Sequence, residues 1–254
     1  MIWPQRNFFY DARCWLLAGF LLLALLSIVS TLHQRRGDTG KFSLVSSERR
    51  YTSLAAALRE PDRVYILDLF GQGLTEFPLG ILQLRNLREL DLSANPLSEL
   101  PPTIGTLSQL EELYLNQTAI TQLPAEVGEL SRLSKLYLAQ TQLTALPPSV
   151  AGLRRLKKLV LTASPIRQLP PEIGRAWVLG NLDLNQTQLQ TLPPEISQLK
   201  KLRTLSLNET PLTFLPAQFE RLEDLRNLFV VGTPIAERQL QLLEQRLPKL
   251  TIHR

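Results

Sequence analysis

The sequence predicts an α/β solenoid, in which a short strand and a short helical turn follow one another in every coil. Two observations support this fold class. A 23-residue unit recurs eight times from Val64, and each copy opens with apolar residues in the pattern L-x-x-L-x-L. Seven of the eight copies carry a proline further along, usually as Leu-Pro. A fixed period of this length indicates stacked repeats that bury one continuous core.

The two halves of each unit have different expected structures. The alternation L-x-L places both leucines on one side of a short strand and the intervening residue on the other. Successive strands should pair in parallel, about 4.8 Å apart. After Leu-Pro, the chain should form a helical turn over the leucine layer, where the proline nitrogen has no ladder hydrogen bond to donate.

These units resemble the leucine-rich repeat family in its 23-residue form, L-x-x-L-x-L-x-x-N-x-L-x-x-L-P-x-x-I-x-x-L-x-x. The resemblance covers residues 64–254, about three-quarters of the chain. It implies a right-handed curved horseshoe with a parallel β-sheet on its concave face. It also implies a role in binding proteins or peptides, although a repeat of this kind is far more specific for fold than for function.

The ninth position of the unit departs from the family. An asparagine there both donates and accepts hydrogen bonds, so it can satisfy backbone groups between adjacent coils. One copy keeps the asparagine, one has Gln72, and the others have hydroxyl residues, which can do the same over a shorter reach. The sequence therefore predicts a buried structural ladder, formed by Asn95, Thr118, Thr141, Ser164, Thr187, Thr210 and Thr233.

Both ends of a solenoid need caps, because an open end exposes the core. Residues 52–63 are predicted to form an N-terminal cap helix, residues 64–235 the eight repeats, and residues 236–254 the C-terminal cap. The only cysteine is Cys14, so no intrachain disulfide can hold either cap. The caps must therefore be held on the core by side-chain packing.

Residues 14–32 are an apolar run without a charge. As a helix the run would be about 28 Å long, close to the hydrocarbon thickness of a membrane. It is predicted to be a transmembrane helix or signal anchor, between an N-terminal tail (residues 1–13) and a flexible tether (residues 33–51). A cleaved signal peptide is the alternative, although the run is long for that role and no clear A-x-A-like site follows it.

The basic residues around the apolar run predict its orientation. Arg6 and Arg13 precede the run, whereas five Lys or Arg residues follow it before position 52. The positive-inside rule therefore favours a single-pass membrane protein whose repeats lie in the cytoplasm. Export of the repeats is the alternative.

A partner-binding site is predicted at the middle of the concave face. There Tyr114 and Tyr137 should lie side by side, with acidic residues on the N-terminal side and basic residues on the other. An aromatic centre with a charged rim is typical of a protein-binding hot spot. The alternative is that the two tyrosines only support the sheet as a cross-strand pair. The predicted site comprises Asp91, Glu112, Tyr114, Lys135, Tyr137, Lys158, Val160 and Asp183.

Other classes of function are disfavoured. The net charge is +5, but residues 63–254 contribute only +2, which argues against general binding of nucleic acid. The two histidines, His33 and His253, cannot form a catalytic set with Cys14, and no phosphate-binding loop or Cys/His metal spacing is present. We therefore expect no enzyme activity, cofactor, metal or small-molecule substrate.

The sequence as a whole predicts a membrane-anchored scaffold that binds a protein or peptide partner on its concave face. The alternative is an exported, bacterial-type surface protein whose repeats serve adhesion or structure.

Overall fold

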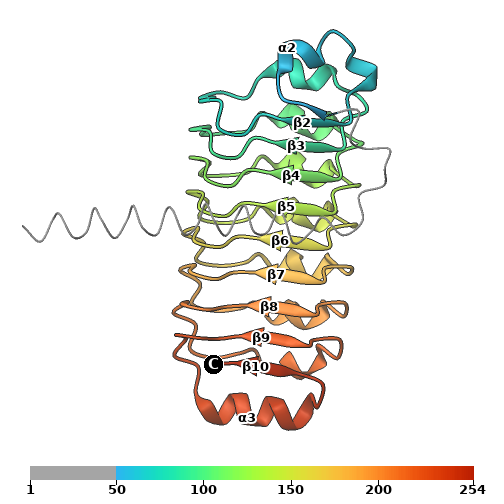
Figure 1. The fold of residues 1–254 in the computed structure, drawn as a ribbon. Helices are drawn as coiled ribbons and strands as arrows, with labels where there is room; N and C mark the ends of the chain where they lie inside the picture. Colours follow the sequence, from blue (N-terminus) through green and yellow to red (C-terminus); the bar gives the residue numbers. More distant parts are fainter. Residues whose placement is uncertain (1–49) are drawn as a thin grey trace, which may run out of the picture. The chain divides into compact units, whose positions relative to one another are not determined.

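In this computed structural model, residues 50–254 are described, and they form one parallel sheet whose strands follow chain order (Figure 1). The predicted tail, the apolar run 14–32 and nearly all of the tether lie outside the described residues. The ten strands are β1 (Arg50–Tyr51), β2 (Ile66–Asp68), β3 (Glu89–Asp91), β4 (Glu112–Tyr114), β5 (Lys135–Tyr137), β6 (Lys158–Val160), β7 (Asn181–Asp183), β8 (Thr204–Ser206), β9 (Asn227–Phe229) and β10 (Thr251–His253).

The central residue of each repeat strand points into the core. These leucines recur every 23 residues from Leu67 to Leu228, and each is no more than 1% exposed. Their partners in the sheet are the equivalent leucines of the adjacent coils, as in the pairing of Leu113 with Leu136. Since side chains alternate along a strand, the two residues that flank each leucine face the opposite side.

Short 3₁₀ helices line the side of each coil away from the strands. A proline with φ between −65° and −71° precedes six of them and sets the backbone angle from which the turn starts. The helices are η3 (Leu79–Gln83), η4 (Pro102–Thr106), η5 (Ala125–Glu129), η6 (Pro148–Gly152), η7 (Pro171–Arg175), η8 (Pro194–Gln198) and η9 (Phe219–Arg221).

The N-terminal end of the sheet differs from the sequence prediction. The cap is not one helix over residues 52–63 but two short pieces, α2 (Leu54–Ala57) and η2 (Pro61–Arg63). Arg50 and Tyr51, which the prediction assigned to the tether, form β1 and pair with Ile66 and Leu67. The outermost strand of a sheet has unpaired backbone N–H and C=O groups, and β1 forms hydrogen bonds with those of β2.

At the other end, α3 (Glu237–Arg246) covers the last coil, and β10 pairs with β9 (Figure 1). Leu240 and Leu243 of α3 are buried against the core. Within residues 50–254, none of the helices combines the length and apolar character that crossing a membrane requires.

Candidate functional site

The strand register places the predicted partner-binding residues in one continuous strip on the sheet face. Each of them flanks a buried central leucine, and neighbouring coils align them in two columns. At the first strand position the column is Glu89, Glu112, Lys135, Lys158 and Asn181, and at the third position it is Asp91, Tyr114, Tyr137, Val160 and Asp183.

The two tyrosines form the centre of this strip. The ring centroids of Tyr114 and Tyr137 are 4.6 Å apart, and the ring planes differ by 6°. The Lys158 ammonium lies 5.1 Å from the centroid of the Tyr137 ring, in a cation–π contact. Tyr114 is half-buried, whereas Tyr137 is only 6% exposed. The pair therefore presents less aromatic surface than two solvent-facing rings would.

Glu112 links the aromatic and charged parts of the strip. It accepts a hydrogen bond from the Tyr114 hydroxyl at 2.5 Å and forms an ion pair with Lys135 at 3.1 Å. Burial, followed by the charge of Glu112, raises the pKa of the Tyr114 phenol above its ordinary range. The phenol consequently stays protonated and acts as a hydrogen-bond donor at neutral pH.

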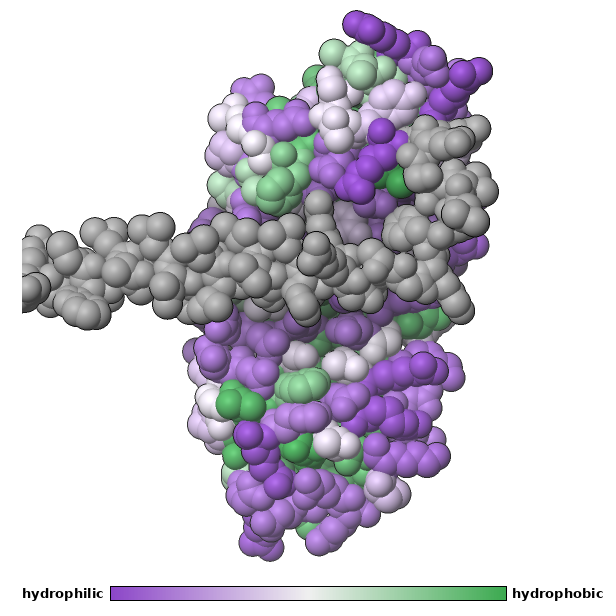
Figure 2. Space-filling model, viewed as in Figure 1, coloured by the Kyte–Doolittle hydropathy of each residue, from purple (hydrophilic) through white to green (hydrophobic). Residues whose placement is uncertain are grey.

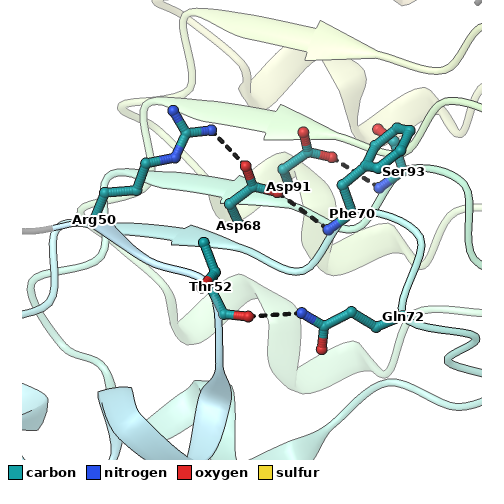
Figure 3. A network of polar contacts seen from close by, with 7 residues as sticks. All are labelled: Arg50, Thr52, Asp68, Phe70, Gln72, Asp91 and Ser93. Atoms are coloured by element: carbon teal, nitrogen blue, oxygen red, sulfur yellow. Dashed lines mark hydrogen bonds and ion pairs between the residues drawn. The ribbon is translucent and has the colours of Figure 1, made fainter.

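Carboxylates gather at the N-terminal end of the strip (Figure 3). Asp68 forms an ion pair with Arg50 at 2.5 Å and accepts a hydrogen bond from the backbone nitrogen of Phe70 at 3.1 Å. Asp91 accepts the equivalent bond from the backbone nitrogen of Ser93 at 2.8 Å. These aspartates therefore shape the turn that follows each strand, besides placing charge on the sheet face.

Asp183, a predicted site residue, repeats this turn contact in β7. Its carboxylate accepts a hydrogen bond from the backbone nitrogen of Asn185 at 3.1 Å. Burial raises the pKa of Asp183, while hydrogen bonds from Asn185 and Thr162 and the charge of Lys158 act in the opposite direction.

Glu89, at the first position of β3, is a partly buried carboxyl group. Burial raises its pKa to about 7, and the charges of Glu112, Asp91 and Asp68 add to the effect, whereas Arg50 opposes it. The sequence prediction did not include Glu89 in the site, although its column position was apparent. The pKa depends on how closely the neighbouring carboxylates pack, which the sequence pattern does not give.

A second aromatic pair lies at the C-terminal end of the sheet face. The rings of Phe229 and His253 stack with centroids 4.1 Å apart and planes 9° apart, and His253 Nε2 is 3.3 Å from Asn227 Oδ1. The sequence prediction missed this pair. The alternation Leu250-Thr251-Ile252 was the available signal, because its extension by one residue aligns His253 with Phe229.

The predicted hydroxyl ladder lies inside the coils, but its hydrogen bonds stay within each coil. Thr118, Thr141, Ser164, Thr187 and Thr210 are all buried, and Thr233 is half-buried. Each hydroxyl donates to the carbonyl three residues earlier, as Thr141 does to Leu138 at 3.0 Å. At this position of the coil the hydroxyls donate within their own coil, so these residues close their own turns instead of joining coils.

Asparagines in a different column bond across coils. The side-chain oxygen of Asn116 accepts a hydrogen bond from the backbone nitrogen of Ala139 at 2.9 Å. Asn185 does the same for Asn208, and Asn208 for Val231, both at 2.8 Å. Asn95 alone among the predicted ladder residues bonds across coils, to Leu69 and Leu74.

Among the residues that the structure describes, no group of three His, Cys, Asp or Glu side chains is placed to hold a metal ion.

Comparisons with known proteins agree with this geometry. The leucine-rich repeat family model matches residues 85–143 and 178–235. The chain is similar to a leucine-rich repeat protein of Leptospira interrogans, with 31% identity over 80% of this chain and 57% of that one and a TM-score of 0.69. An internalin of Listeria monocytogenes, at 18% identity, shares the fold over 82% of this chain and 58% of that one, with a TM-score of 0.67.

A plant protein is also similar. It is the ectodomain of the Arabidopsis thaliana membrane receptor kinase GASSHO1/SCHENGEN3, in complex with CASPARIAN STRIP INTEGRITY FACTOR 2. The match has 27% identity over 73% of this chain and 23% of that one, with a TM-score of 0.62. The chain thus spans less than two thirds of each of these three solved chains. No match is found among curated proteins. On its repeats and its fold, the chain belongs to the leucine-rich repeat family.

Proposed function

We propose that this protein is a membrane-anchored interaction module that binds a protein or peptide partner on its sheet face. The observation that carries the proposal is the strip centred on Tyr114 and Tyr137, where an aromatic stack is flanked by Glu112, Lys135 and Lys158. Aromatic and charged side chains that are already held in place lose little conformational freedom on binding. The strip is therefore suited to a partner with a complementary charge pattern and an apolar centre.

The membrane part of the proposal depends on the apolar run 14–32, which has the length of a membrane span and no charge. The excess of basic residues after the run supports a cytoplasmic location for the repeats. The alternative is an exported protein that uses the same repeats for adhesion or surface structure. Its support is the similarity to a Leptospira interrogans leucine-rich repeat protein and to an internalin of Listeria monocytogenes.

Photocrosslinking tests the binding site directly. A benzophenone amino acid is placed at Asn181, at the end of the strip, or at Thr204, the next position of the same column; both are half-buried on the sheet face. Irradiation in the cells that make the protein, followed by mass spectrometry, should identify one recurrent partner. The crosslink should then disappear in the double variant Tyr114→Ala/Tyr137→Ala.

Two further variants keep this test independent of stability. Lys135→Glu/Lys158→Glu reverses charge without removing the tyrosine stack, and it should also abolish the crosslink. Phe214→Ala removes a 51% exposed aromatic outside the strands and should leave the crosslink unchanged. Circular dichroism confirms that each variant is folded. A partner that crosslinks equally well to both folded double variants would show that the strip is not the binding site.

Protease accessibility separates the two locations of the repeats. Added to intact cells, protease should leave the repeat domain undigested and should digest it only after the membrane is opened. Digestion in intact cells would instead support the exported alternative.

A further inference from the structure

Trp177 and Val178 are two consecutive exposed apolar residues in the turn between η7 and β7. Trp177 is 64% exposed and Val178 is 40% exposed. The equivalent pairs of the neighbouring coils are Arg154-Arg155 and Lys200-Lys201, which are all exposed. In Figure 2 the C-terminal coils present a mainly hydrophilic surface, in which hydrophobic side chains are isolated. A tryptophan has a large ring with one polar group, which suits an interface that is apolar on one side and wet on the other.

Exposed basic side chains lie near the two apolar side chains. Lys157 and Arg203 lie in the coils on either side of Gly180, two residues after Val178, because Gly180 donates a backbone hydrogen bond to the Lys157 carbonyl at 2.9 Å and accepts one from the Arg203 nitrogen at 2.8 Å. We call Arg154, Arg155, Lys157, Trp177, Val178 and Arg203 the edge patch. Within residues 50–254, none of its four basic side chains takes part in an ion pair, a side-chain hydrogen bond or a ring contact.

The edge patch lies where the strands begin. Trp177 precedes β7 by four residues, and the two arginines precede β6 by three and four residues. The described chain also enters the sheet on the side where the strands begin, because Arg50 is the first residue of β1 and all the strands are parallel. Seventeen residues (33–49) connect the apolar run to Arg50, and a chain of that length spans at most about 60 Å. A membrane that holds the run is therefore within reach of this edge.

We propose that the edge patch docks the repeat domain on a membrane surface that contains anionic lipid headgroups. Tryptophan rings favour the membrane–water interface, and basic side chains are attracted to anionic headgroups, each strengthening binding by roughly fivefold. In this arrangement the side of the solenoid at which the strands begin meets the membrane. The sheet face stays open to a partner. The proposal rests on the membrane anchor of the proposed function, but not on the tyrosine strip.

Trp177 fluorescence tests the proposal in the full chain. The chain has three tryptophans, so Trp3→Phe and Trp15→Phe leave Trp177 as the sole fluorophore. This protein is reconstituted into vesicles of phosphatidylcholine alone or of phosphatidylcholine mixed with phosphatidylglycerol. With the anionic lipid, Trp177 emission should shift to shorter wavelength and be quenched by brominated acyl chains. High salt should reverse both effects because it screens the exposed charges.

A matched pair of variants establishes the role of the patch. Arg154→Glu/Arg155→Glu should abolish the shift in anionic vesicles. Arg238→Glu/Lys249→Glu makes the same change in net charge at exposed positions of the C-terminal cap and should leave the shift in place. Equal Trp177 emission in the two kinds of vesicle would overturn the proposal. A response to poly-glutamate but not to anionic vesicles would also overturn it and assign the patch to an acidic protein.

Co-sedimentation with neutral vesicles reports on the anchor separately. If the chain does not sediment with them, the anchor of the proposed function fails. The edge patch would still be supported by binding to anionic vesicles that requires Arg154 and Arg155, and overturned by the absence of such binding.

Discussion

Asn95 and Leu74 belong to different coils, and the side-chain oxygen of Asn95 accepts a hydrogen bond from the Leu74 backbone nitrogen at 3.0 Å. Its amide nitrogen donates to the Leu69 carbonyl in the same preceding coil at 2.9 Å and to the Leu92 carbonyl in its own coil at 2.8 Å. Asn95 is 1% exposed, so these bonds are sheltered from water. Thr118, at the equivalent position of the next coil, donates only to Leu115 of its own coil.

Replacing Asn95 by threonine tests the contribution of this bridge. Asn95→Thr should lower the free energy of unfolding by about 2–4 kcal/mol, because the Leu74 nitrogen and the Leu69 carbonyl lose a buried partner. Urea unfolding of the full chain in detergent measures the change. Gln83→Thr, at an exposed position of η3, is the control and should change stability by less than about 0.5 kcal/mol. Equal stability of Asn95→Thr and the parent would contradict the bridge.

The hydroxyl at Thr141 should stabilise its own coil. Thr141→Val should destabilise the domain by about 1–3 kcal/mol, because the Leu138 carbonyl is left without its buried donor. Thr144→Val removes an exposed hydroxyl and should have little effect. Urea unfolding of both variants gives the comparison. A loss near zero for Thr141→Val would mean that the buried hydroxyls contribute nothing to the fold.

Gly152 should tolerate no side chain. A Cβ atom there would lie 2.1 Å from the Gly128 carbonyl oxygen in the adjacent 3₁₀ helix, so Gly152→Ala must push two coils apart. We expect a loss of about 1–3 kcal/mol and a lower melting temperature. Gly180→Ala is the matched control, because the nearest atoms to its Cβ are carbonyl oxygens at 3.7 Å. Equal melting temperatures for the two variants would contradict the close contact.

The free energy of unfolding should decrease as pH rises, because Glu89 ionises. The folded pKa is raised from 4.5 to about 7, so between these values the unfolded state loses the proton more readily and is favoured. The decrease begins as pH rises above about 4.5 and is complete above about 7. We expect it to be on the order of 1–2 kcal/mol, allowing for solvent screening of a half-buried group.

Glu89→Gln should remove this part of the pH dependence and be more stable than the parent at pH 8. Unfolding free energies of the two proteins from pH 4 to pH 8 provide the measurement. Parallel pH profiles would show that Glu89 titrates at its ordinary pKa.

The 23-residue period was sufficient to align Tyr114 with Tyr137 and Lys135 with Lys158, because the register of a solenoid is repeated from coil to coil. The period also identified the residues at the ninth position of each unit. It did not show which backbone groups their side chains bond. Thr141 bonds within its coil and Ser134 bonds across coils to Glu111, and which of the two a hydroxyl does depends on where the packed coils place its partners.

By itself, the sequence determined the repeat, the leucine core and the order of side chains on the sheet face, since these follow from local alternation and contact with the adjacent coil. Only the tertiary structure decided that Arg50 and Tyr51 join the sheet and that Tyr137 is nearly buried. It also decided that the pKa of Glu89 lies near 7. These properties depend on the packing of side chains from several coils, and a repeat pattern specifies the neighbours of a residue but not how tightly they enclose it.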